Sequence, residues 1–285
     1  MNNCIVVIPI YKINPKLSEI ASFRQGLMVL KRYDVSIFTY EGLDLSIYKN
    51  IAAEVGKNYS VEYFDKYYFE SVAGYNELCF KHEFYERFLK YEYMLIYQLD
   101  AWVFRDELQH WCDKEYDYIG APIFWAYNDK CFTDKVSGIG NGGFSLRRVS
   151  YCLRMLNMPR LRPYMKPTRI FKMYYNYFCY ADKYRSLKKK LLIVPLCLVK
   201  MFGIYNNLNY FMRTKQINED MMFGTNAKYA WGGKVNLPTE MEAMKFSFEV
   251  HPEMLYHKIG DRLPFGCHAF EKWSFDTFWS KYIQV

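Results

Sequence analysis

Short apolar runs alternate along the first 120 residues with segments whose apolar positions recur at helical spacing. The runs 4–10, 35–40 and 116–119 are almost continuously apolar, which is typical of strands buried on both faces. In residues 17–32 and 76–89 apolar side chains recur three and four positions apart, so the pattern predicts an amphipathic helix over each. Such alternation predicts an α/β fold with a mainly parallel sheet covered by helices.

One apolar run, residues 93–104, contains an acid, Asp100. A carboxylate is costly to bury unless a cation or strong hydrogen-bond donors compensate it. In open α/β sheets, ligands bind at the carboxyl ends of the strands. Asp100 is therefore a candidate contact for a metal or a substrate. The alternative is that it caps the turn after the strand.

Three further polar clusters follow. Four glycines lie within residues 138–143, and glycine permits positive φ and close approach of the backbone to a ligand. Glu219 and Asp220 precede an apolar helical start, and His268 lies on a loop made rigid by proline and glycine. Each cluster also has a structural interpretation: a tight hairpin turn, a helix cap and a hydrogen-bonded histidine.

Composition narrows the class of protein. With 51% hydrophobic and 24% charged residues, the 285-residue chain is globular rather than disordered. Its 20% aromatic content suits sugar platforms and membrane interfaces as well as a core. The eight cysteines form no C-x-x-C pair, and residues 1–3 lack the basic segment of a signal peptide. We therefore expect reduced thiols and a cytosolic location.

Residues 154–215 form a strongly basic segment. They carry fourteen Lys or Arg and one acid, a net +13 in a chain of net +8, so the remainder is net −5. Three lysines at 188–190 precede an apolar run at 191–199, which is too short to span a bilayer. The combination predicts contact with the surface of an anionic membrane, the alternative being a solvated helical hairpin. No nucleic-acid-binding motif accompanies the charge, so nucleic acid is not expected as a partner.

Taken together, the motifs resemble those of GT-A nucleotide-sugar glycosyltransferases, and most closely a bacterial family of glycosyltransferases catalogued as a domain of unknown function. The resemblance covers residues 4–150 and 216–275. The segments that carry it are Gly74-Tyr75-Asn76, Tyr97-Gln98-Leu99-Asp100, Tyr118-Ile119-Gly120-Ala121-Pro122, Gly140-Asn141-Gly142-Gly143-Phe144-Ser145-Leu146-Arg147, Glu219-Asp220 and Pro264-Phe265-Gly266-Cys267-His268. It implies a GT-A (Rossmann-like) catalytic domain of residues 1–153 and 216–285, interrupted by the insert 154–215.

The resemblance also implies a metal and a donor site. GT-A enzymes usually carry a D-x-D motif, but here Gln98 stands at the position of the first acid. Asp100 and His268 are then the expected ligands of Mn²⁺ or Mg²⁺, and mixed oxygen and nitrogen ligands suit Mn²⁺ better. The residues expected to bind the nucleotide-diphosphate sugar are Pro9, Tyr11, Asn76, Gln98, Asp100, Asn141, Gly142 and Gly143.

The acid pair is implied to serve catalysis. Asp220 is the expected general base toward the acceptor hydroxyl, and Glu219 orients the acceptor or holds the local loop. The expected function is an inverting transferase at the cytoplasmic membrane face, acting on a glycan such as a lipid-linked oligosaccharide for bacterial surface polysaccharide. Two alternatives stay open: a retaining transferase of the same fold, and a non-catalytic, membrane-associated sugar-binding protein, which the missing acid at Gln98 favours.

Overall fold

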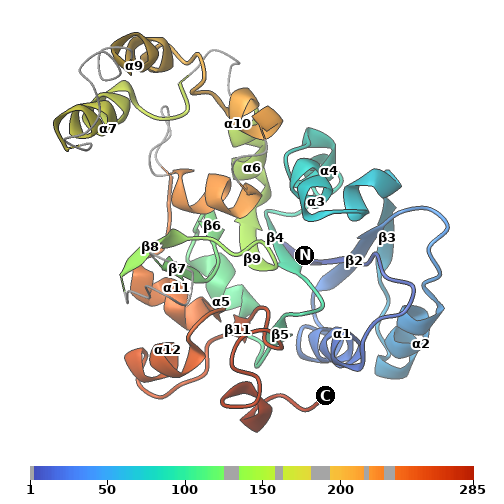
Figure 1. Ribbon diagram of the computed structural model, residues 1–285. Coiled ribbons are helices and arrows are strands. Elements are labelled where there is room, and N and C mark those ends of the chain that lie inside the picture. The colour runs from blue at the N-terminus through green and yellow to red at the C-terminus, as the bar shows by residue number, and fades with distance from the viewer. Residues whose placement is uncertain (1–2, 125–134, 158–162, 181–192, 215–217, 228–234) are drawn as a thin grey trace.

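The computed structural model describes residues 3–124, 135–157, 163–180, 193–214, 218–227 and 235–285. Its centre is a six-stranded sheet of order β3-β2-β1-β4-β9-β6 (Figure 1). The strands are β1 Cys4–Pro9, β2 Asp34–Thr39, β3 Ser60–Tyr63, β4 Tyr93–Tyr97, β6 Tyr118–Ile119 and β9 Phe144–Arg148.

Most of this sheet is parallel. Strands β1, β2, β3 and β4 run in one direction, and β9 pairs antiparallel with both β4 and β6. The predicted α/β class, with a mainly parallel sheet flanked by helices, is confirmed. The carboxyl ends of β1 and β4 lie side by side because these two strands pair directly, and that edge is where a ligand site is expected.

Both faces of the sheet are covered, which explains the continuous apolar runs. On β1, Val6 and Ile8 belong to one core cluster with Leu27 of α1. The intervening Ile5 and Val7 belong to the other cluster, which includes side chains of α3, α4 and α6. Figure 1 shows α1 and α2 on one side of the sheet and α3 and α4 on the other.

Short helices connect and cover the strands. They are α1 Leu17–Val29, α2 Ser46–Val55, α3 Val72–Cys79, α4 His82–Glu86, α5 Leu108–Asp113, α6 Val149–Leu156, α7 Pro167–Tyr180, α9 Ile193–Met201, α10 Leu208–Thr214, α11 Glu240–Phe246 and α12 Pro252–Lys258. The 3₁₀ turns η1 Lys66–Phe69 and η4 Trp279–Lys281 and the π-turn η2 Met221–Thr225 complete them.

The prediction of one helix over 76–89 is wrong in its extent. Two short helices, α3 and α4, meet at Lys81, whose extended backbone (φ −91°, ψ 138°) no α-helix can contain. Helix α4 ends at Glu86, so Leu89, the last residue of the predicted helix, lies outside it and is 61% exposed. Apolar spacing survives the break because both helices pack on the same core cluster, which includes Leu78 and Phe84.

The apolar run 93–104 also divides. Strand β4 ends at Tyr97, the chain turns through residues 98–101, and β5 Trp102–Val103 joins a second, three-stranded sheet of order β10-β11-β5. Its other strands are β10 Ser247–Phe248 and β11 Gly266–Cys267. A third sheet pairs β7 Pro122–Phe124 with β8 Val136–Ile139. Asp100 therefore lies in the turn between two sheets.

The described part of the basic insert is helical. Helices α7 and α9 pack on each other at a distance from the central sheet (Figure 1). Buried Asn206 anchors them, since its side chain donates to the carbonyls of Met165 and Lys200, both at 3.0 Å. The three lysines at 188–190, which are predicted to contact a membrane surface, lie outside the described residues. Among the described helices, none has the length and apolar character needed to cross a bilayer, and six described cysteines are free and buried.

Candidate active site

A pocket of about 310 Å³ opens at the carboxyl ends of β1 and β4. Four of the residues expected to bind the donor line it: Pro9 and Tyr11 after β1, and Gln98 and Asp100 after β4. Lysine side chains from elsewhere in the chain also line it (Lys12, Lys16 and Lys272). Glu19 and Glu271 line it as well and form ion pairs with Lys12 and Lys16, so the formal charges of the lining balance, and Asp100 and Lys272 are its other charged groups. An anionic ligand that shares a cation with Asp100 fits such a mixed lining.

The small second sheet brings Asp100 and His268 together across 168 residues of sequence. His268 directly follows β11, which pairs antiparallel with β5, and β5 begins two residues after Asp100. The His268 backbone N–H donates to the carbonyl of Phe248 on β10 at 2.9 Å. Its Nε2 then lies 3.2 Å from Oδ1 of Asp100.

The charges of this pair support each other. Partial burial raises the pKa of Asp100, but the charge and hydrogen bond of His268 outweigh it, so that pKa lies below its ordinary value. Burial lowers the pKa of His268, but Asp100 and then Glu249 more than compensate and raise it to about 10. At neutral pH Asp100 is therefore ionised and His268 is protonated. His268 has to release the proton on Nε2 before that nitrogen can bind a metal ion, as every histidine ligand does.

These two side chains fit a metal ion as part of its ligand set. Atoms 3.2 Å apart can bind one divalent ion at the roughly 2.0–2.2 Å distances of nitrogen and oxygen ligands. The side chain of Asp100 is 43% exposed, so further ligands can reach it from the pocket. Within the described residues, no group of three or more His, Cys, Asp or Glu is arranged to hold a metal. A ligand such as a diphosphate would have to complete the coordination.

The glycine-rich loop lies between this pair and the acid pair. A Cβ on Gly143 would stand 2.0 Å from Nε2 of His268, and one on Gly142 would stand 2.5 Å from Oε1 of Glu219. Neither glycine has positive φ; in this loop that conformation belongs to Asn141 (φ 76°). The glycines are needed because side chains from both other motifs press against the loop.

Asn141 organises the loop. Its Oδ1 accepts hydrogen bonds from the N–H groups of Gly143 and Phe144 at 3.0 and 3.3 Å, and its own backbone N–H donates to Oδ2 of Asp220 at 2.8 Å. The backbone N–H groups of Asn141 and Gly143, two of the residues expected to bind the donor, are therefore already hydrogen-bonded within the protein. The buried Nδ2 of Asn141 has no hydrogen-bond partner among the described atoms, and Asn141 does not line the pocket.

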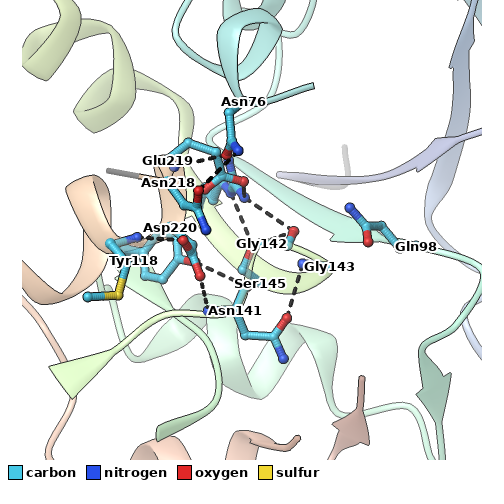
Figure 2. Close-up of polar contacts among 12 residues, drawn as sticks. Asn76, Gln98, Tyr118, Asn141, Gly142, Gly143, Ser145, Asn218, Glu219 and Asp220 are labelled. Atoms are coloured by element: carbon cyan, nitrogen blue, oxygen red, sulfur yellow. Dashed lines mark hydrogen bonds and ion pairs between the residues drawn. The ribbon is translucent and has the colours of Figure 1, made fainter. Parts of the chain in front are cut away.

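Asp220 is half-buried on the other side of the loop (Figure 2). Its Oδ1 accepts from the backbone N–H of Met221 at 2.7 Å, so it does cap the π-turn η2. Desolvation and then the charge of Glu219 raise its pKa to about 7, although the amides of Asn141 and Met221 act against the shift. A carboxylate that exchanges its proton near neutral pH has the property required of a general base.

Glu219 is buried in an ion pair. Its Oε1 accepts from Arg147 at 2.8 Å, and the two side chains are 2% and 0% exposed. Arg147 also donates to the carbonyl of Gly142 at 3.3 Å. Removing one partner of a buried pair costs roughly 3–5 kcal/mol, so this pair fixes the acid segment against the loop.

Asn76 lies away from the pocket. Its Oδ1 accepts from the backbone N–H of Glu219 at 3.1 Å, and its Nδ2 donates to Asn218 at 3.3 Å. Figure 2 shows Asn76 directed at these residues, whereas Gln98 stands apart on the other side of Gly143. Asn76 therefore supports the acid pair instead of lining the expected donor site.

The charged residues that line the pocket beside Asp100 (Lys12, Lys16, Glu19, Glu271 and Lys272) were not selected from the sequence, and neither were two that contact the proposed site residues, Arg147 and Glu249. The sequence does give an indication for Arg147, because it follows Phe144 and Leu146 in a buried strand. An unpaired cation would be costly there, so a partner acid is expected. Glu249 has no such signal. It follows a two-residue strand that no periodicity reveals.

Comparison with known proteins gives a family. A profile of the family described as "Protein of unknown function (DUF5672)" matches residues 58–268, which is most of the chain. The expected resemblance to a family catalogued as a domain of unknown function is thereby confirmed. No curated protein matches the sequence.

Solved structures give distant likenesses. Core-mannan synthase A from Aspergillus fumigatus, in its Mn/GDP form, has a TM-score of 0.39 at 9% identity over 85% of this chain and 82% of that one. A glycosyltransferase involved in glycosylation of the major capsid of PBCV-1 has a TM-score of 0.35 at 11% sequence identity, over 93% of this chain and 92% of that one. A cytidylyltransferase from Leptospira borgpetersenii has a TM-score of 0.33 at 9% sequence identity, over 56% of this chain and 66% of that one. At these scores and identities, none of them carries an argument about this chain.

Proposed function

The chain belongs to the family described as "Protein of unknown function (DUF5672)", and we propose that it is a metal-dependent glycosyltransferase that uses a nucleotide-diphosphate sugar. One observation carries the proposal: a single glycine-rich loop separates Asp100, which meets His268 at the edge of the pocket, from Asp220, which accepts from the loop's Asn141 N–H. The opposite pKa shifts of the two acids support different tasks for them. Asp100 stays ionised for a cation, and Asp220 can exchange a proton.

The donor is proposed to occupy the pocket beside Asp100. Its volume of about 310 Å³ lies at the low end of ligand pockets. Tyr11 offers an aromatic surface that is 46% exposed. Lys272 offers a positive charge to a diphosphate, whereas Lys12 and Lys16 are already paired with Glu19 and Glu271.

Asp100 and His268 are proposed to hold Mn²⁺ or Mg²⁺. When bound, such an ion offsets the negative charge that grows on the departing nucleoside diphosphate. The protein's own contribution is to keep Asp100 ionised and to direct both side chains to the same point.

Asp220 is proposed to accept the proton of the acceptor hydroxyl. The acceptor oxygen then bonds to the anomeric carbon as the bond from that carbon to the diphosphate breaks, which inverts the anomeric configuration when attack comes from the opposite face. Glu219, at 1% exposure and paired with Arg147, holds the loop and leaves the acceptor to other residues.

A retaining transferase is the second candidate. The observation that favours it is the double engagement of Asp220 by backbone amides, which would suit a carboxylate that only binds substrate. The anomeric configuration of the product, read by NMR, separates the two. A non-catalytic sugar-binding protein would release no nucleotide at all.

A thermal-shift screen of nucleotide-diphosphate sugars tests the proposed donor class. With Mn²⁺ present, at least one of them should raise the melting temperature, because a ligand that binds only the folded state stabilises it. The same sugar without its nucleotide should give no shift. If no nucleotide sugar shifts the melting temperature with either Mn²⁺ or Mg²⁺, the proposed donor site is wrong.

The acceptor is proposed to be presented at a membrane. In this proposal residues 154–215 are an accessory segment of the catalytic domain 1–153 and 216–285. Large apolar side chains are exposed on and beside α7 and α9, among them Phe171 at 58%, Leu198 at 52% and Phe202 at 75%. Together with the +13 charge they suit the headgroup zone of an anionic leaflet. A lipid-linked oligosaccharide for a bacterial surface polysaccharide, met at the cytoplasmic face, is the acceptor that fits this location.

Changing the three lysines at 188–190 to glutamate should release the protein from anionic vesicles and spare donor turnover. Each basic residue near such a surface contributes up to about 1 kcal/mol, and salt should weaken wild-type binding because the screening length is roughly 8 Å at physiological ionic strength. Vesicle co-sedimentation over a salt series measures this. Transfer to a lipid-linked acceptor should fall, and transfer to a short soluble analogue should survive.

The matched control changes three exposed lysines far from α7 and α9 (Figure 1): Lys49 on α2, Lys258 on α12 and Lys281 on η4. It alters net charge equally, so it should keep most of the vesicle binding. Equal loss in both triple variants would reduce the effect to net charge. Unchanged binding in the 188–190 variant would leave the insert as a solvated hairpin.

A further inference from the structure

Glu249 and His268 are neighbours because of the small sheet. Strands β10 and β11 run parallel, with Phe248 paired to Cys267, so the next residue of each strand emerges at the same edge. The hydrogen bond from the His268 N–H to the Phe248 carbonyl fixes that register. The backbone thus brings a second carboxylate to the expected metal ligand.

The imidazole of His268 lies between two carboxylates. Nε2 lies 3.2 Å from Asp100 Oδ1, and Nδ1 lies 3.4 Å from Glu249 Oε1. The side chains of His268 and Glu249 are 15% and 16% exposed, so little solvent can substitute for the contact between them. Glu249 therefore faces the ring nitrogen that a metal on the Asp100 side would leave free.

We infer that Glu249 is the positioning residue of the centre proposed at Asp100 and His268. A histidine that binds a metal almost always donates its other ring N–H to a carboxylate, carbonyl or water, which fixes its orientation. The buried Nδ1 forms no hydrogen bond among the described atoms. Glu249 Oε1, at 3.4 Å, is the carboxylate oxygen that faces it, so Glu249 is the group placed to accept that proton. This inference rests on the proposed function, and specifically on its metal.

The assignment gives a reason for the acid missing at Gln98. Of the residues after strand β4 that line the pocket, Asp100 is the carboxylate. Gln98 places an amide oxygen 3.4 Å from His268 Nε2. The second negative charge of the centre comes instead from the end of β10. Glu249 acts through the histidine, because it lies on the opposite edge of the ring from Asp100.

Direct measurement of Mn²⁺ binding tests this assignment without any turnover. The EPR signal of free Mn²⁺, titrated with protein, gives the Kd of wild type and variants. Glu249→Gln keeps the shape but removes the charge and should weaken binding 10- to 100-fold, the usual effect of such outer carboxylates. Glu249→Asp keeps the charge and should recover part of that loss. Glu253→Gln, four residues along the chain where the carboxylate bonds Thr277 at 2.8 Å, should bind like wild type.

A double-mutant cycle separates positioning from other roles. In a His268→Ala background, Glu249→Gln should cause no further loss of Mn²⁺ affinity, because Glu249 then has no ligand to orient. Losses that add would make Glu249 a direct ligand or a structural residue, and wild-type affinity in Glu249→Gln would give it no role; either result overturns the inference. If wild type binds no Mn²⁺, or Asp100→Asn binds it equally, the metal of the proposed function fails instead.

Discussion

Replacing Asp220 by asparagine should reduce the turnover of sugar transfer by a factor on the order of 10² to 10⁴, the usual contribution of a general base. The pH dependence should change with it. Only ionised Asp220 can accept a proton, and its pKa is raised to about 7. Wild-type kcat should therefore increase as the pH rises through about 7 and level off above it. The variant should lack this limb. Steady-state kinetics over pH 5 to 9 measures both effects.

Donor affinity decides what a loss of turnover means. The base acts on the acceptor, so Asp220→Asn should bind the nucleotide sugar like wild type. Its melting temperature is needed too, since the asparagine amide can satisfy only one of the two backbone N–H groups that Asp220 accepts from. Asp106→Asn, at a surface ion pair with Arg32, is the matched control and should behave like wild type. Loss of donor binding in Asp220→Asn would assign Asp220 to the nucleotide or to the fold.

Asp100→Asn should abolish Mn²⁺-dependent donor binding and leave the fold intact. The substitution is isosteric at a side chain that is 43% exposed, so it removes little besides the charge. His268→Ala should weaken the same binding, because the pair supplies both proposed protein ligands. Calorimetric titration of the nucleotide sugar, with and without Mn²⁺, measures the effect.

The control for this pair lies in the same pocket. Glu271 lines it but bonds Lys16 at 3.0 Å, so Glu271→Gln removes a pocket carboxylate without touching the proposed ligands. It should keep the metal dependence of donor binding. If Asp100→Asn and His268→Ala also keep it, the metal site is misplaced.

The central sheet could be predicted because its residues carry their own signal. Strands buried on both faces are continuous apolar runs. Strands β1 and β4 lie within predicted runs, and β2 begins one residue before its run. The same principle located Asp100, a costly acid at the end of such a run. Helix breaks leave no equivalent trace, and the division into α3 and α4 at Lys81 was therefore missed.

The assembly of the site could not be predicted from local pattern. His268 reaches Asp100 through strands of two residues, β5 and β11, which are too short for any periodicity. Glu249 depends on the same sheet. The glycines of the loop were singled out correctly, but the positive φ belongs to Asn141, and Gly142 and Gly143 are required by the side chains of Glu219 and His268.

Release of nucleoside diphosphate from a panel of nucleotide sugars, measured while Mn²⁺ is titrated, tests the central claim most directly. The proposed function predicts that wild type releases nucleotide from at least one donor, in proportion to metal occupancy, and that a chelator stops the release. Asp100→Asn should show none at any metal concentration. Release that is equal with and without metal, or absent for every donor with both Mn²⁺ and Mg²⁺ in the presence of acceptor glycans, would contradict a metal-dependent glycosyltransferase.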